Sequence, residues 1–102
     1  MNTIMKPVKL VTIIALDSLE AKIVQDMDKL EIRGYTISPA HGKGLHSKKI
    51  SDWEGTNIRI ESLVSEEKGK KLVEMIRDKY LNKYGVVLFV SDVEVLRPER
   101  YS

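Results

Sequence analysis

Apolar positions along the chain alternate between two spacings, which predict short strands and amphipathic helices in turn. The run KLVTIIAL, from Lys9 to Leu16, is rich in β-branched and aliphatic side chains and predicts a strand that is apolar on both faces. Asp17 and Glu20 have the spacing of a capping box for a following helix. We expect that helix from about Ser18 to Glu31, because apolar residues recur at helical spacing at Leu19, Ile23, Met27 and Leu30.

The next two apolar segments predict two strands joined by a long connection. The first runs from Tyr35 to Ala40 and stops near Pro39. The second runs from Thr56 to Ser65, and its alternation predicts that one of its faces is buried. The buried side is carried by Ile58 and Ile60, whereas Arg59 and Glu61 point the other way.

The last part of the chain predicts a second helix and a fourth strand. Ser65 is a suitable N-cap, and Leu72, Ile76 and Tyr80 form the inner stripe of the helix. Gly69 weakens this helix by about 1 kcal/mol relative to alanine without abolishing it. The run VVLFV, residues 86–90, then predicts a strand that leads into SDVEVLRPERYS.

This order of elements predicts an α+β chain with the ferredoxin-like βαββαβ fold, as a single domain over residues 1–102. Both helices should cover one face of an antiparallel four-stranded sheet, which leaves the other face bare. The last strand should lie at a sheet edge, and an exposed VVLFV edge favours aggregation unless it is covered. We therefore expect an obligate oligomer in which sheets of several subunits pack together.

Composition excludes several functional classes. Seventeen Lys and Arg against fifteen Asp and Glu give a net charge of +2, far below the basic excess typical of nucleic-acid binders. The chain has no cysteine, so disulfides, thiolate metal sites and cysteine nucleophiles are excluded. It shows neither a signal peptide nor an apolar run long enough to span a membrane, so we expect a cytoplasmic protein without membrane insertion.

The connection between the second and third strands, HGKGLHSKKISDWEG, is the first candidate for a functional segment. It covers residues 41–55, whereas a hairpin usually needs two to five residues, and long loops in compact domains are often functional. Gly42 and Gly44 flank Lys43, so main-chain N–H groups can turn toward an anion, and Lys48 and Lys49 add positive charge. A solvated hairpin tip without a ligand remains the alternative interpretation.

Other candidates in and beyond this loop have two interpretations each. His41 and His46 can bind a divalent metal ion or remain solvated, and no third ligand is evident. Trp53 can stack on a base or dock on a partner protein, or else cover the neighbouring subunit. Arg97 and Arg100 can clamp a phosphate, or belong to a solvated C-terminal tail over residues 97–102.

Enzyme chemistry has no visible machinery in this sequence. The chain contains no P-loop, no nucleophile elbow, no HExxH motif and no close acidic pair in an apolar setting. An RNA-recognition domain needs aromatic residues on its central strands, which are absent here. An acylphosphatase-type enzyme needs an arginine-bearing turn after the first strand, and that is absent too. We therefore expect a protein that is not an enzyme and uses no cofactor.

Three segments together resemble the PII signal-transduction superfamily: GYTISPAHGKG, IRIESLV and VVLFVSDVEVLRPER. The resemblance covers nearly the whole chain and implies a ferredoxin-like homotrimer with nucleotide sites in the clefts between subunits. It also implies that residues 41–55 are the effector-contacting T-loop. The ending SDVEVLRPER and the GKG turn look more like the PII-like branch associated with bicarbonate transporters and carboxysomes.

The resemblance assigns roles to individual positions. The family's glycine-rich phosphate loop is replaced here by NKYGVV, which shifts the expected ligand from ATP toward AMP or ADP, with cyclic AMP also a candidate. Regulation of inorganic-carbon uptake or fixation would act through a partner, such as a membrane transporter or a carbon-fixation protein. A metal-responsive trimer of the same fold is the alternative. The candidate bicarbonate residues, chosen for their charge in and beside the loop, are Lys48, Lys49 and Arg59. The resemblance assigns six positions to the nucleotide site: Gly34, Thr36, Gly42, Gly44, Glu61 and Arg100, with Arg97 one place off an expected arginine. Further candidate nucleotide contacts are Lys43, Gly85, Val86 and Val87.

Overall fold

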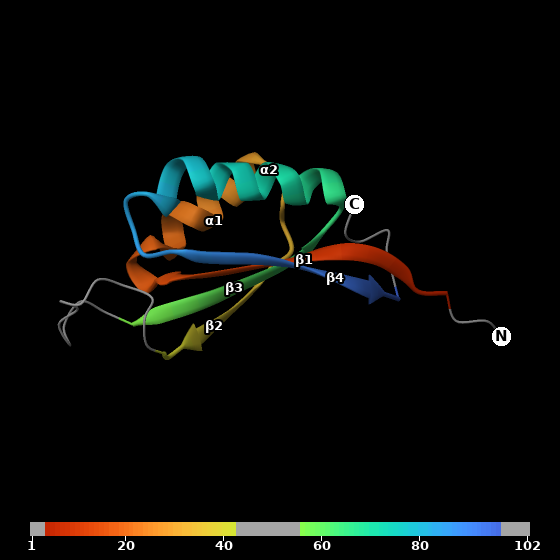
Figure 1. Ribbon diagram of the computed structural model, residues 1–102, viewed down its shortest axis with the longest axis horizontal. Coiled ribbons are helices and arrows are strands. Elements are labelled where there is room, and N and C mark those ends of the chain that lie inside the picture. The colour runs from red at the N-terminus through yellow and green to blue at the C-terminus, as the bar shows by residue number, and fades with distance from the viewer. Residues whose placement is uncertain (1–3, 43–55, 97–102) are drawn as a thin grey trace.

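Two helices lie on one side of a single antiparallel sheet in the computed structural model, which describes residues 4–42 and 56–96 (Figure 1). The strands are β1 (Lys6–Leu16), β2 (Thr36–Ala40), β3 (Asn57–Val64) and β4 (Val87–Val95). A 3-10 turn, η1 (Asp17–Leu19), precedes α1 (Glu20–Lys29). The second helix, α2 (Glu66–Ile76), continues into a π-helical turn, η3 (Arg77–Leu81). The expected βαββαβ ferredoxin-like fold is confirmed.

The sheet has the strand order β2-β3-β1-β4, with every neighbouring pair antiparallel. The fourth strand therefore lies at an edge, as predicted, and β2 forms the other edge. Proline removes a ladder donor and is confined to edges and strand ends, so an edge position for β2 accommodates Pro39. The two edges differ in length, since β2 has 5 residues and β4 has 9.

The helix-covered face of the sheet holds the hydrophobic core. Alternation along β1 and β3 directs Val11, Ile13, Ile58 and Ile60 toward the helices, and all four are buried. Helix residues complete this core with Ile23, Met27, Leu72, Ile76 and Tyr80. The periodicity of the sequence predicted the helix and β3 members of this set, because one stripe of each helix and one face of that strand must leave water together. The first strand was predicted to be apolar on both faces, so its helix-facing side was not singled out.

The opposite face of the sheet carries no helix in the part of the chain described. Because side chains alternate, Thr12 and Ile14 of β1 lie on this face, and the strand register sets them beside Glu61 and Arg59 of β3. On the other side of Thr12 lies Phe89, whose side chain is 43% exposed. We call this surface the open face. It mixes apolar and charged side chains, whereas the expected oligomer contact was inferred from apolar surfaces.

The start of the first helix differs from the sequence prediction. The expected capping box of Asp17 and Glu20 is wrong, because no side chain caps η1 or α1. Instead, the Asp17 carboxylate accepts a hydrogen bond from Thr56 Oγ1 at 3.1 Å, and the Asp17 N–H donates to the Thr56 carbonyl at 2.7 Å. The Asp17 side chain therefore makes a tertiary contact instead of the local capping box that the sequence spacing predicted.

The predicted ends of the elements move by a few residues. The first strand starts at Lys6 rather than Lys9, and the fourth extends to Val95 instead of ending at Val90. The predicted N-cap of α2 is confirmed, since Ser65 Oγ accepts from the Lys68 N–H at 3.3 Å. Within residues 4–42 and 56–96, no helix combines the length and apolarity needed to cross a membrane.

Candidate functional site

A cavity of about 400 Å³ lies where the start of β2 meets β3 and β1. The register pairs Thr36 with Glu61, so these two side chains project from the same face of the sheet. The pairing of Leu10 with Leu63 places two apolar side chains beside them. The cavity is lined by Leu10, Gly34, Tyr35, Thr36, Glu61 and Leu63.

Gly34 is held at the cavity by its own carbonyl. Ser62 is buried on the helix-covered side of β3, and its Oγ donates to the Gly34 carbonyl at 2.7 Å. This bond anchors the connection that leads from α1 into β2. A Cβ added at Gly34 would meet no heavy atom within 4 Å, so the described chain leaves open space beside this backbone. A ligand can therefore approach the main chain here without displacing protein atoms.

The cavity carries one carboxylate, which an arginine holds in place. Glu61 Oε2 lies 3.5 Å from an Nη atom of Arg59, and both side chains are partly exposed. Such a pair contributes only about 0–1 kcal/mol to folding because water screens it. The Arg59 Nε atom is buried and has no hydrogen-bond partner among the residues described. One donor of this guanidinium is therefore unsatisfied within the described part of the chain.

These groups suit a planar, partly apolar ligand that donates a hydrogen bond. Leu10 and Leu63 provide apolar contact, and Tyr35, 39% exposed, offers an aromatic ring. The Glu61 carboxylate accepts hydrogen bonds, and it can take one from an exocyclic amine such as that of adenine. Pockets for small molecules commonly combine apolar walls with a few polar groups in this way.

The structure brings three of the predicted nucleotide residues together and sets others apart. Gly34, Thr36 and Glu61 share the cavity. The predicted group of Gly85, Val86 and Val87 lies at the start of β4, on the opposite edge of the sheet. Three inter-strand steps of about 4.8 Å separate β2 from β4, or roughly 14 Å. One copy of the chain therefore does not gather both groups around one small ligand.

Main-chain groups near the start of β4 are partly engaged already. The Val86 N–H donates to the Tyr84 carbonyl at 2.8 Å, and the Val86 side chain is buried in the core. Val87 pairs with Ile14 in the sheet. Gly42 and His41 are exposed at the end of β2. The other predicted residues lie outside the described part of the chain, so their roles stay predictions: Lys43, Gly44, His46, Lys48, Lys49, Trp53, Arg97 and Arg100.

Three residues of the cavity were missed by sequence reasoning. Leu10 and Leu63 were interpreted only as strand residues, and Tyr35 only as the start of a strand. The alternation of β3 offered a signal for one of them, since Leu63 is two residues beyond Glu61 and must share its face. Leu10 and Tyr35 required the strand register and the cavity itself.

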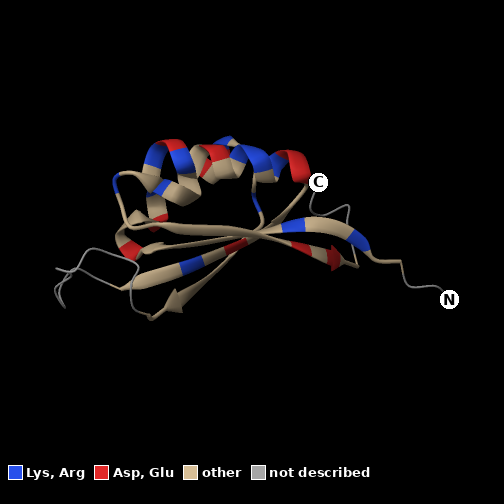
Figure 2. Ribbon diagram, in the orientation of Figure 1, with Lys and Arg blue, Asp and Glu red and all other residues tan. Residues whose placement is uncertain are grey.

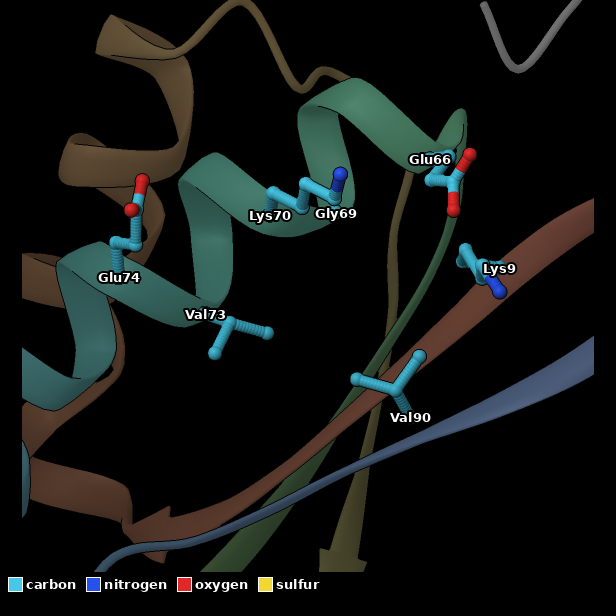
Figure 3. A pocket seen from close by; sticks show the side chains of 7 residues that line it. All are labelled: Lys9, Glu66, Gly69, Lys70, Val73, Glu74 and Val90. Atoms are coloured by element: carbon cyan, nitrogen blue, oxygen red, sulfur yellow. The ribbon is translucent and has the colours of Figure 1, made fainter.

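A second hollow, of about 350 Å³, lies on the helix side of the sheet between α2 and the β1–β4 pair. Figure 3 shows Val73 of α2 and Val90 of β4 lining its gap, with Lys9 on β1. Two lysines are matched there by two carboxylates, since Lys70, Glu66 and Glu74 also line it. It therefore has no net charge from its lining and offers no preference for an anion.

Metal binding gains no support from the described residues. Within residues 4–42 and 56–96, no group of three or more His, Asp or Glu side chains is arranged to hold an ion. His41 is exposed, and its predicted companion His46 is outside the described part. The metal-responsive alternative therefore remains a sequence-based hypothesis.

Comparison with known proteins identifies a matching family and similar structures. The family model for nitrogen regulatory protein P-II matches residues 8–100. A PII-like signaling protein from Thermus thermophilus is 41% identical, with a TM-score of 0.83, over 96% of this chain and 98% of the other.

Two structures of CPII from Thiomonas intermedia are also similar. One, bound to ADP and bicarbonate, is 26% identical, with a TM-score of 0.85 over 99% of this chain and 100% of that one. The other, bound to ADP, AMP and acetate, is 27% identical, with a TM-score of 0.83 over 96% and 97%. The likeness therefore extends over nearly the full length of each chain.

Proposed function

This chain belongs to the nitrogen regulatory protein P-II family, and from that membership we propose that it is a signalling protein that binds AMP or ADP rather than an enzyme. The observation that carries the proposal is the cavity shared by Gly34, Thr36 and Glu61. The family resemblance of the sequence independently assigns these three positions to the nucleotide site.

The adenine base is proposed to enter this cavity. Leu10 and Leu63 would contact the flat faces or edges of the base, and the Glu61 carboxylate would accept from its exocyclic amine. The open backbone at Gly34 allows the ligand to lie close to the main chain. The similar CPII protein is bound to ADP in two structures, which supports an adenine nucleotide as the ligand class.

The complete site is proposed to form between subunits of a homotrimer. The cavity lies beside β2, whereas Gly85, Val86 and Val87 lie at the β4 edge, roughly 14 Å away by strand spacing. A neighbouring copy that sets its β4 edge near β2 would bring both groups to one ligand. Lys43, Arg97 and Arg100 are the proposed phosphate contacts.

Bicarbonate is the proposed second ligand. The partly exposed Arg59 side chain lies beside Glu61, which lines the cavity, and its buried Nε has no described partner. A guanidinium suits bicarbonate because it donates two parallel hydrogen bonds to a planar oxyanion. Lys48 and Lys49 are further candidates. With these two ligands, the protein would regulate inorganic-carbon uptake or fixation in the cytoplasm through a partner protein.

Calorimetry on the full chain tests the nucleotide proposal. AMP, ADP, ATP and cyclic AMP would each be titrated with and without bicarbonate. We expect AMP or ADP to bind more tightly than ATP. Glu61→Gln should weaken that binding about tenfold, since a hydrogen bond to a charged group contributes about 1.5–3 kcal/mol. Glu67→Gln on exposed α2 is the matched control and should leave affinity unchanged.

Two results would count against the proposal. The absence of heat from every nucleotide would remove it altogether. Equal losses of nucleotide affinity from Glu61→Gln and Glu67→Gln would show that the base does not bind in this cavity. Bicarbonate is tested separately by Arg59→Lys, which keeps the charge but removes the planar fork and should abolish any bicarbonate effect on nucleotide affinity.

A further inference from the structure

A cleft between the two helices has a charge that neither the fold nor the nucleotide site explains. It encloses about 270 Å³ where the first turns of α1 meet η3. Three lysines and one carboxylate line it, with two tyrosines at its wall: Lys22, Lys79, Lys83, Asp26, Tyr80 and Tyr84. Charges of both signs cover the rest of the helix layer (Figure 2). The α1–η3 cleft thus has a local excess of positive charge.

The single carboxylate of this cleft is already compensated. Asp26, 8% exposed, accepts a hydrogen bond from the Tyr80 hydroxyl and one from Lys79 Nζ at 3.0 Å. Lys29 Nζ lies 3.9 Å away as a further cation. Burial raises the pKa of the Asp26 carboxyl, but the bonds from Tyr80 and Lys79 outweigh it and hold that pKa below its usual 3.8. The Asp26 carboxylate therefore stays ionised, and its charge is neutralised by Lys79 and Lys29.

Two lysines of the cleft remain available. No ion pair or side-chain hydrogen bond involves Lys22 or Lys83 in the described residues, 4–42 and 56–96. The π-helical turn presents one of them: it places Tyr80 inward, and the following turn continues to Lys83, whose N–H bonds the Tyr80 carbonyl at 3.2 Å. π-Helical turns of this kind often occur at functional sites. Both lysines therefore line the cleft without a carboxylate partner among the residues described.

The cleft lies at the end of the molecule where β3 begins. Leu16, just before η1, pairs with Asn57, the first residue of β3. Asp17, which precedes Lys22 by five residues, is also joined to Thr56 by two hydrogen bonds. A partner that contacts Thr56 and the start of β3 would therefore come close to the cleft as well.

We propose that the α1–η3 cleft docks an acidic segment of a partner protein, with Lys22 and Lys83 pairing its carboxylates. Lysines on flexible stems are adaptable contacts, and the exposed Tyr84 adds an aromatic ring of the kind enriched in protein interfaces. Complementary charge of this kind guides association and selects partners. A small free oxyanion fits less well, because the lining offers side-chain ammonium groups rather than converging main-chain donors. The inference rests on the proposed function only in requiring that the protein act through a partner.

The test uses isotope-labelled full-length protein and a capped hexaglutamate peptide as the probe, followed by NMR at low salt. We expect the largest shift changes at residues 22–26 and 79–84. The double variant Lys22→Gln/Lys83→Gln should weaken the peptide about tenfold, since each exposed pair contributes up to about 1 kcal/mol. The control Lys70→Gln also removes a lysine charge, but on the part of α2 far from the cleft. It should weaken peptide binding less than about twofold.

Three outcomes would overturn the proposal. The first is the absence of shift changes, and the second is changes that spread over all helix lysines or fall equally with Lys70→Gln. The third is saturable binding of inorganic phosphate at the same amides without further change from the peptide, which would make this a small-anion site. Nucleotide calorimetry on the double variant separates the two proposals: intact nucleotide binding with lost peptide binding supports both sites independently.

Discussion

The two faces of the sheet differ in how they treat buried polar groups, although their residues alternate along the same strands. Toward the helices, Ile13 and Ile60 are fully buried among apolar partners, and the buried Ser62 finds its bond on the Gly34 carbonyl. On the open face, Thr12 is equally buried, yet its Oγ1 has no partner in the residues described. The helix-covered face thus pairs its buried hydroxyl within a single chain, whereas the open face leaves one unpaired among the residues described.

The largest expected effect separates Ile13 from Ile14, which are adjacent but lie on opposite faces. Ile13→Ala should lower the free energy of unfolding by about 2–5 kcal/mol, because it leaves a cavity in a filled core. Ile14→Ala, on the partly exposed side, should cost less in a dilute monomer. Urea denaturation of both variants measures the difference. Equal losses would show that the two faces are equally packed within one chain.

The second effect concerns assembly through the open face. Phe89→Ala removes a side chain that is 43% exposed in the single chain, and its full burial would be worth about 1.5–3 kcal/mol per copy. We expect native mass measurements to show a trimer that dissociates at higher protein concentration than the unaltered one. Leu81→Ala, an exposed apolar position on the helix side, is the control and should leave the mass distribution unchanged. A stable monomer of the unaltered protein at micromolar concentration would remove the oligomer altogether.

The third effect tests a buried polar group that is satisfied on the helix side. Asp26→Asn should cost about 1–2 kcal/mol, because the charged acceptor of Tyr80 and Lys79 is lost. The pKa of Asp26 is lowered in the folded chain, so its contribution is present above about pH 4 and disappears as the pH falls through the folded value. Thermal unfolding from pH 7 to pH 2 should therefore show the two proteins converging in acid.

The exposed Asp28→Asn is the matched control, since it removes the same charge two residues away on the same helix. It should follow the unaltered protein at every pH. A constant gap between Asp26→Asn and the unaltered protein down to pH 2 would show that packing, and not the ionised carboxylate, carries the effect.

The smallest effect is the most informative about the open face. Thr12→Val replaces a buried hydroxyl without a described partner by a methyl of similar size, and should change the monomer's stability by less than about 1 kcal/mol, toward greater stability. If a second copy supplies a partner for Thr12 Oγ1, the same change should weaken the oligomer. Sedimentation and chemical denaturation of one sample distinguish these cases.

Much of the fold followed from periodicity, since burial forces one face of each element to be apolar. The stripe of Leu72, Ile76 and Tyr80 and the alternation of β3 were visible for this reason. The Asp17 capping box failed because Thr56, thirty-nine residues away, competes for the same carboxylate. Local spacing carries no information about such tertiary contacts.

The site was predictable only in part for a related reason. Gly34, Thr36 and Glu61 were found through family resemblance, and the register then explained why they meet. Leu10 joins them through its pairing with Leu63, which depends on strand order. Asp26 and Tyr80 are fifty-four residues apart, so their bond and the cleft beside it required the packed structure.

The two hydrogen bonds between Asp17 and Thr56 have a consequence for how this protein can change over evolutionary time. Together with the Ala40–Asn57 pair, they fix both ends of the segment 41–56 on the sheet. For loops in general, closing the chain between fixed ends costs only about 0.6 kcal/mol more for each doubling of loop length. Insertions and deletions there should therefore be nearly neutral for folding, which leaves that stretch free to be selected for a new target while the scaffold is inherited intact.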